Sequence, residues 1–408
     1  MNKEAELVLA VSQGIVSGGN NNGRLKDLIT RGSVNWARFK ELLTYHDLEP
    51  IAYPMLKGSL SFVPEDLTKF FKARYFGSLI SSQYLWREFL EISDRFKERG
   101  ILILPIKGIS FLADIYCSNP CRSMTDIDIL VKEEDIREAK EILLGLLGYE
   151  ERLDGLTEEY WLKKQCHLEF IKRAGKKTFF VDLHFGLDFK RKPREILPRL
   201  WDRVREADID ARPIRLLSPE DALFSLALHQ RRFGNVLGLK NILDLALLLH
   251  KYKHGFDWGY VISEAKAGRM TANAFFILLQ AKTFFEADIP KTVWRGLSVP
   301  FYKRILIKGL IEKDTFSSTS YQRLKGLYLK VHLLLYDSLW EPIEYILNIP
   351  QEQFAKFYSL DPYSKSTDLF YRSRLFYILL RTLRDLLRKP ISFSFVILLS
   401  GWSFCRVC

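Results

Sequence analysis

Residues 122–131 read Arg122-Ser-Met-Thr-Asp-Ile-Asp-Ile-Leu-Val131, so that two carboxylates one residue apart open an apolar, β-branched run. Side chains at i and i+2 leave the same face of a strand, so Asp126 and Asp128 point one way and the apolar residues the other. Two anions held this close repel each other, and Mg²⁺, which prefers carboxylate oxygens, would remove the repulsion. The pattern predicts a metal site on a strand, although alone it also fits a strand that starts at a solvated acidic turn.

The sequence before this strand predicts a strand, a glycine turn and a helix. Residues 100–105 form a short apolar run, Lys107-Gly108 follows as the turn, and residues 109–116 have helical spacing. The first turn of a helix presents free backbone N–H groups at the positive end of the helix dipole, which suits a phosphate group. Lys107 adds a positive charge beside that position.

The sequence after the strand predicts a β-hairpin, with arms at residues 165–172 and 177–185 around a turn at 173–176. On the second arm Phe180, Asp182 and His184 share one face, and aromatic and aliphatic residues occupy the other. A carboxylate among such neighbours is costly unless it is paired or bound to a metal. Asp182 is therefore a third candidate ligand.

These parts, in this order, resemble the nucleotidyltransferase superfamily that includes DNA polymerase beta. A narrower resemblance, over roughly residues 85 to 250, is to the bacterial group called nucleotidyltransferase family protein. The motifs that carry it are residues 104–108, Tyr116, 122–131, 181–184 and 217–221. The chain departs from the superfamily's usual Gly-Ser or Gly-Gly turn, because Lys107 comes first and the serine is displaced to Ser110.

The resemblance implies an Mg²⁺-dependent nucleotidyltransferase, an enzyme that transfers a nucleoside monophosphate from an NTP such as ATP to an acceptor and releases pyrophosphate. It implies two Mg²⁺ ions held by Asp126, Asp128 and Asp182. Asp182 is expected to be the base, or to orient the base, for the acceptor hydroxyl. The residues expected to contact the nucleotide are Lys107, Gly108, Ser110, Arg122 and His229.

Three polar residues have a structural alternative to a nucleotide contact. Arg122 either neutralises phosphate charge or stays solvated in a polar loop. His229 and Asp244 lie on predicted helices, at positions that recur as motifs in the resembled family. The alternative for His229 is packing in the core, and for Asp244 it is a buried ion pair with Lys240 or Arg232.

Length and composition predict two or three domains, because 408 residues with 48% apolar content exceed one typical domain. We expect an α+β protein, in which an α/β nucleotidyltransferase core with a small mixed sheet occupies residues 86–213. An N-terminal helical region at 1–85 and a larger C-terminal helical region at 214–408 flank this core. Ser218-Pro-Glu-Asp221 predicts a capped helix start in the last region.

Several partners and one compartment follow from charge and composition. The net charge of +12 favours polyanionic partners, among them an RNA end. Residues 371–389 form a basic amphipathic pattern, and the apolar residues 391–404 are too few to span a bilayer, which needs roughly 20. Residues 371–404 are thus expected either to pack on the protein or to contact an anionic membrane surface. With no signal peptide at the first residues, we expect a cytoplasmic protein, peripheral at most at the inner face of the membrane.

The sequence leaves the acceptor and the activity class open. A small molecule or sugar phosphate, a protein side chain and an RNA end compete as acceptors. A non-catalytic nucleotide-binding regulator is the alternative class, although such a module would lose Asp182 at little cost. The five cysteines are expected to be ordinary thiols, because a chain of this size in a reducing compartment forms no disulfide framework.

Overall fold

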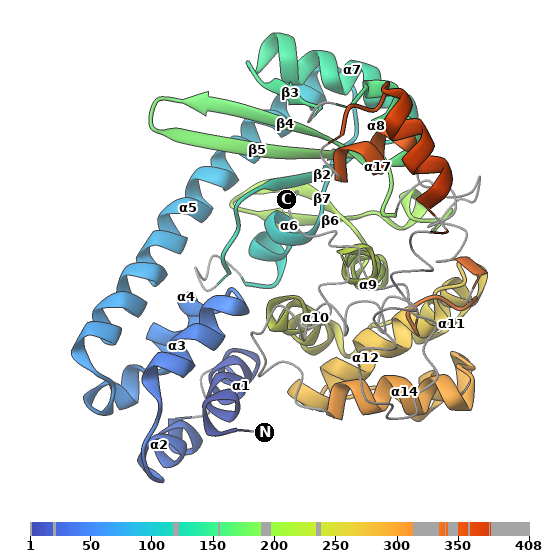
Figure 1. Cartoon of the computed structure of the whole chain (residues 1–408). Coiled ribbons are helices and arrows are strands. Elements are labelled where there is room, and N and C mark those ends of the chain that lie inside the picture. Colours follow the sequence, from blue (N-terminus) through green and yellow to red (C-terminus); the bar gives the residue numbers. More distant parts are fainter. Residues whose placement is uncertain are drawn as a thin grey trace.

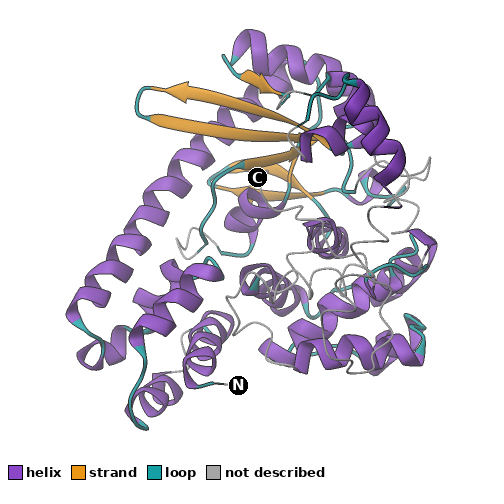
Figure 2. Ribbon diagram, viewed as in Figure 1, coloured by secondary structure: helices purple, strands orange, loops and turns teal. Residues whose placement is uncertain are grey.

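The computed structural model describes residues 2–18, 22–116, 122–153, 156–188, 197–233, 238–312, 334–338, 340–341, 350–357, 360–374 and 376. A small sheet lies against one long helix and beside a body of packed helices (Figures 1 and 2). The predicted fold class, α+β with a small mixed sheet and many helices, is confirmed. The apolar tail at 391–404 and most of the basic pattern at 371–389 lie outside the described residues.

The main sheet has five strands in the order β1-β2-β5-β4-β3. Their bounds are β1 Leu104–Pro105, β2 Ile127–Leu130, β3 Glu150–Arg152, β4 His167–Ala174 and β5 Lys177–His184. β2 and β5 pair in parallel, and the other neighbours pair antiparallel. The predicted hairpin is confirmed as β4 and β5, whereas the first predicted strand is reduced to two residues.

The two faces of this sheet differ in chemistry, as the alternation along the strands requires. Ile127, Ile129, Val181 and Leu183 are fully buried and join one apolar core with Phe89. Phe89 lies on the second half of α5 (Glu65–Glu98), which passes behind β4 and β5 in Figure 1. The opposite face carries the polar side chains of Asp128, Asp182 and Glu169, which the apolar core does not cover.

Short elements connect and extend the sheet. They are α6 Lys107–Asp114, η2 Glu133–Asp135, α7 Ile136–Glu141, the π-helical η3 Ile142–Leu146, α8 Glu158–Lys164, η4 Trp201–Arg203, β6 Arg205–Ile209 and β7 Arg212–Leu216. β6 and β7 form a separate two-stranded sheet. α6 follows β1 directly, as the predicted strand, turn and helix required.

The N-terminal region is helical, as expected. It contains α1 Lys3–Val16, α2 Asn22–Thr30, α3 Trp36–Tyr45, α4 Glu49–Met55, η1 Lys57–Phe62 and α5. α5 is one continuous helix of 34 residues, and the predicted domain boundary at residue 85 falls inside it. Its first half packs on the N-terminal helices and its second half on the sheet, with Phe71 in one apolar core and Phe89 in the other.

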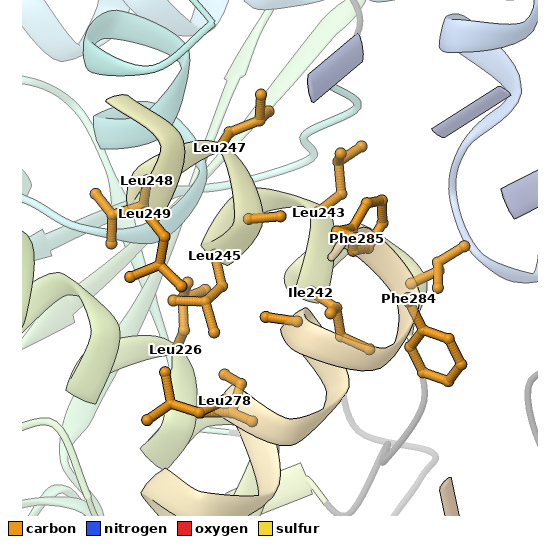
Figure 3. Close-up of a cluster of buried hydrophobic side chains, with 14 of the residues drawn as sticks. Leu226, Ile242, Leu243, Leu245, Leu247, Leu248, Leu249, Leu278, Phe284 and Phe285 are labelled. Atoms are coloured by element: carbon orange, nitrogen blue, oxygen red, sulfur yellow. The ribbon is translucent and has the colours of Figure 1, made fainter. Parts of the chain in front are cut away.

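The helices after the sheet form the second body. They are α9 Pro219–Phe233, α10 Leu239–Tyr252, α11 Trp258–Ala267, α12 Thr271–Phe285, α13 Lys291–Gly296, α14 Phe301–Glu312 and α17 Gln351–Phe357. α9 begins as predicted, because Ser218 Oγ accepts a hydrogen bond of 3.1 Å from the backbone N–H of Asp221. Figure 3 shows the apolar side chains through which α9, α10 and α12 pack together.

The helices before and after the sheet share one core. Fully buried side chains of α1 and α3, such as Val8 and Leu43, belong to the same apolar cluster as Leu245 of α10 and Ile277 of α12. Burial of this apolar surface holds the N-terminal helices against α10 and α12. Among the helices that the structure describes, none is long and apolar enough to cross a membrane.

Candidate active site

Lys107 begins α6 in an unusual backbone conformation that directs its side chain to the acid pair. Its φ is +51°, in the left-handed region that residues other than glycine rarely adopt. The preceding residue, Ile106, is extended, and its N–H donates to the carbonyl of Asp128 over 3.0 Å. The turn is thereby fixed to β2, and Lys107 Nζ donates to Asp128 Oδ1 over 2.5 Å. Such backbone strain is often found at functional sites.

Asp128 is the most firmly held carboxylate of the site. It is buried, and its Oδ1 accepts from Lys107 and lies 2.9 Å from His184 Nε2. Burial by itself raises the pKa of Asp128, but the Lys107 ammonium and His184 outweigh it and hold this pKa far below its usual range. Burial and the Lys107 ammonium lower the pKa of His184 well below its ordinary value. Asp128 is thus an anion beside a neutral imidazole.

The parallel pairing of β2 with β5 brings the third carboxylate to the pair. Asp182 is the direct partner of Asp128 in the strand register, and its side chain is 19% exposed. Burial, followed by the charges of Asp128 and Asp126, raises the pKa of Asp182 well above its ordinary value. Burial and the charge of Asp128 likewise raise the pKa of Asp126, which is half-buried at the start of β2. The sheet thus holds three acids that resist being ionised together.

Neighbouring charges leave this negative charge largely uncompensated. Lys107 is the ammonium in direct contact with Asp128, so if all three carboxylates were ionised they would face one positive charge. Glu169, beside Asp182 on the sheet, lies 3.7 Å from Arg152, so that guanidinium offsets another acid. Two negative charges remain, and one divalent cation would balance them.

The donor atoms suit a divalent cation. One ligand atom each of Asp128, Asp182 and His184 lies within 4.8 Å of the others, whereas Asp126 stands outside this tight group. Two carboxylates match the oxygen ligands that Mg²⁺ prefers. His184 Nε2 already bonds Asp128, so it orients a carboxylate, as residues behind metal ligands commonly do. Its role beside Asp128 was missed from the sequence, where only its place on the same face as Asp182 was apparent.

Arg122 has a buried partner instead of the solvated position that was one alternative. Its Nε donates to both carboxylate oxygens of Asp244, at 3.0 and 3.1 Å, and its Nη2 donates to Oδ2 at 2.9 Å. Tyr116 also donates to Asp244, over 2.9 Å. Asp244 therefore forms a buried ion pair, as one alternative held, but its partner is Arg122. Lys240 pairs with Asp47 instead, and the side chain of Arg232, the other expected partner, lies outside the described part of the chain. A direct phosphate contact of Arg122 stays a prediction.

The buried Arg122 leaves no room for a side chain at residue 108. A Cβ placed on Gly108 would lie 2.8 Å from Arg122 Nη1 and 3.2 Å from the sulfur of Met124. The guanidinium therefore packs directly on the first turn of α6, close to the acid pair. Because Asp244 lies on α10, the ion pair connects the helical body to the candidate active site.

The two remaining predicted nucleotide contacts lie on helices. Ser110 is buried within α6, three residues beyond Lys107. His229 is half-buried on α9, a helix that packs against α6. Both stay predictions.

Comparison with known families agrees with this geometry. A family model described as uncharacterised nucleotidyltransferase matches residues 32–286, more than half of the chain. The chain belongs to this nucleotidyltransferase family. It is accordingly a transferase, and the match extends beyond the predicted residues 85–250 to include α3 through α12. No curated protein and no solved structure matches the chain.

The nucleotidyltransferase should depend strongly on the buried ion pair between Arg122 and Asp244. Asp244→Asn leaves Arg122 buried without a counter-charge, so we expect the free energy of unfolding to fall by about 3–5 kcal/mol in chemical denaturation. The control Asp94→Asn breaks a surface ion pair with Arg212, in which both side chains are about half exposed, and should cost at most about 1 kcal/mol. Equal losses in the two variants would contradict the assignment.

The raised pKa of Asp182 predicts how stability depends on pH without divalent cations. A carboxyl whose folded pKa exceeds its unfolded value of 3.8 favours folding only while it is protonated. The unfolding free energy should therefore decline as pH rises from about 4 through the folded pKa. Asp182→Asn should remove this part of the decline, as denaturation curves measured in chelator would show. If the unfolding free energy of Asp182→Asn falls with pH as much as that of the wild type, the pKa of Asp182 is not raised.

Proposed function

We propose that this nucleotidyltransferase is Mg²⁺-dependent and transfers a nucleoside monophosphate from an NTP to an acceptor hydroxyl. The observation that carries the proposal is the parallel pairing of Asp128 with Asp182, with Asp126 beside them on the same face. Three carboxylates around one ammonium form an anionic site that a divalent cation and a triphosphate complete together.

The proposed roles follow from position. Asp126, Asp128 and Asp182 would hold the two Mg²⁺ ions, which when bound neutralise the triphosphate and lower the pKa of the acceptor hydroxyl. Lys107 lies at the first turn of α6, where its ammonium and the helix N–H groups can both meet phosphate oxygens. Gly108 and Ser110 belong to the same turn, and Arg122 lies on its surface.

Asp182 is the proposed proton acceptor. It stands directly opposite Asp128 on the neighbouring strand, and its side chain is 19% exposed, so an acceptor hydroxyl can approach it. It would take the proton of the acceptor hydroxyl while the new bond forms between that oxygen and the α-phosphorus. The bond between the α-phosphorus and the bridging oxygen breaks, and pyrophosphate leaves with the electron pair.

Pyrophosphate release tests the proposal while the acceptor is still unidentified. The purified protein is incubated with each NTP and Mg²⁺ in the presence of sugar phosphates, RNA or candidate proteins. Released pyrophosphate is assayed, and the masses of the products are measured by mass spectrometry. Pyrophosphate and a product heavier by one nucleotidyl group are expected with one acceptor class. Release of inorganic phosphate instead would contradict nucleotidyl transfer, and tight NTP binding without any product would favour the non-catalytic regulator.

Asp182→Asn should separate rate from affinity. We expect single-turnover rates to fall by at least about a hundredfold, because proton transfer acts in the transition state. NTP affinity should change little, since Asp128 and Lys107 remain in place. The matched control Asp208→Asn, at an exposed position on β6, should keep the wild-type rate. Normal turnover in Asp182→Asn would reduce Asp182 to a structural strand residue.

Lys107→Ala should weaken triphosphate binding but not the binding of the cation alone. Loss of a charged hydrogen bond to phosphate is worth roughly ten- to hundredfold in NTP affinity by calorimetry. Without NTP, divalent affinity should hold or increase, because the ammonium that competes for Asp128 is gone. Lys176→Ala, in the exposed hairpin turn, is the matched control and should change neither. Unchanged NTP affinity in Lys107→Ala would remove Lys107 from the site.

A further inference from the structure

A second cluster of metal-binding side chains lies where β4 begins and β5 ends. Cys166, His167 and His184 are all buried, at 0%, 5% and 1% exposure. The two histidines are direct partners in the strand register, and the N–H of Phe185 donates to the carbonyl of Cys166 over 3.0 Å. Backbone pairing thus holds the three side chains at one end of the hairpin, next to the carboxylate site.

Their distances fit a shared metal ion. The sulfur of Cys166 lies 3.7 Å from His167 Nδ1, and the sulfur and one nitrogen of each ring all lie within 4.8 Å of one another. In a tetrahedral zinc site with Zn–S of about 2.3 Å and Zn–N of about 2.0 Å, sulfur and nitrogen are separated by roughly 3.5 Å. The thiol and the His167 ring are therefore close to coordination distance. The two imidazole rings stack with their centroids 4.9 Å apart, so one ring would turn to share the metal.

The hydrogen bonds of His184 leave one ring nitrogen for a metal. Its Nε2 lies 2.9 Å from the ionised carboxylate of Asp128 and 3.3 Å from the Lys107 ammonium. Because that ammonium already donates to Asp128, and the shorter contact of Nε2 is with the carboxylate, we assign the ring proton to Nε2 as a donor to Asp128. Nδ1 then has a lone pair, and within the described part of the chain it is buried with no hydrogen-bond partner. A buried polar atom left in this state is costly, and a bound cation would satisfy it.

We propose that Cys166, His167 and His184 bind one Zn²⁺ ion. A thiolate and two imidazoles form a soft donor set that suits zinc and not Mg²⁺, and three protein ligands leave the fourth tetrahedral position to water. This site differs from the Asp126, Asp128 and Asp182 set in both its atoms and its preferred metal.

The zinc site has a consequence for Asp128. A metal-bound histidine usually donates its other ring N–H to a carboxylate, which fixes the ring and its tautomer. Asp128, His184 and zinc would form such a series, with Nε2 donating to Asp128 and Nδ1 bound to zinc. Zinc would thereby position a carboxylate of the proposed active site. Binding itself requires no nucleotidyl transfer, so it is measurable whether or not the proposed activity is correct.

The test measures metal binding by the full-length protein without nucleotide. After purification without chelator, elemental analysis should find about one zinc per chain, and replacement by Co²⁺ should give a thiolate-to-cobalt charge-transfer band. Cys166→Ser should lose the band and at least about a hundredfold in zinc affinity, since residues merely behind ligands already contribute ten- to hundredfold. Cys117→Ser, which removes one of the other four thiols of the chain, and Asp208→Asn on β6 are the controls, and both should keep zinc and the band.

Two results would overturn the proposal. One is wild-type protein that binds less than about a tenth of a zinc per chain even after titration with zinc. The other is a cobalt-loaded wild type without a thiolate band, which would place the metal on the carboxylates alone. Because both are measured on the wild type, they hold even if Cys166→Ser fails to fold. Circular dichroism shows whether Cys166→Ser is folded. A folded His167→Gln variant should show the same loss of zinc affinity.

Discussion

Asp126, Asp128 and Asp182 repel one another, and the rest of the structure holds them close together in spite of this repulsion. The parallel register of β2 and β5 aligns Asp128 with Asp182, and the apolar core beneath the other face fixes that register. A shift by one residue would bury the acids and expose isoleucine and leucine. The sheet therefore holds unfavourable negative charge, which Lys107 offsets by its direct contact with Asp128. A polyanionic substrate that arrives with divalent cations would relieve this charge.

The helical body supports the site through buried polar contacts. Arg122 reaches from the segment before β2 to Asp244 on α10, and it packs on Gly108 at the start of α6. A buried ion pair adds little net stability, but its loss is costly, so it serves mainly to fix geometry. The family match, over residues 32–286, contains both partners of this ion pair. Arg122 thus connects the segment before β2, the first turn of α6 and α10.

Local patterns in the sequence were sufficient to predict β2, the hairpin of β4 and β5, and the shared face of Asp128 and Asp182, but not β3, β6 or β7. Alternation along residues 177–185 placed Asp182 on a polar face, and the serine cap located the start of α9. Contacts between distant segments carry no such pattern. The pairing of Arg122 with Asp244, 122 residues away, and the shared core of α1 and α10 follow only from tertiary packing. The continuity of α5 across residue 85 likewise depends on the two cores that it joins. The contacts of His184 with Asp128 and of Cys166 with His167 depend on how the strands pair, which the sequence alone did not reveal.

Calorimetric titration of a non-hydrolysable NTP, with and without Mg²⁺, into the wild type and Asp128→Asn tests whether the three acids form a cation-dependent nucleotide site. If they do, the wild type binds the analogue only when Mg²⁺ is present. Asp128→Asn should then lose at least about tenfold in affinity, because one charged ligand of the cation is removed. Equal binding in chelator, or an Asp128→Asn variant with wild-type affinity, would show that the acids do not form such a site.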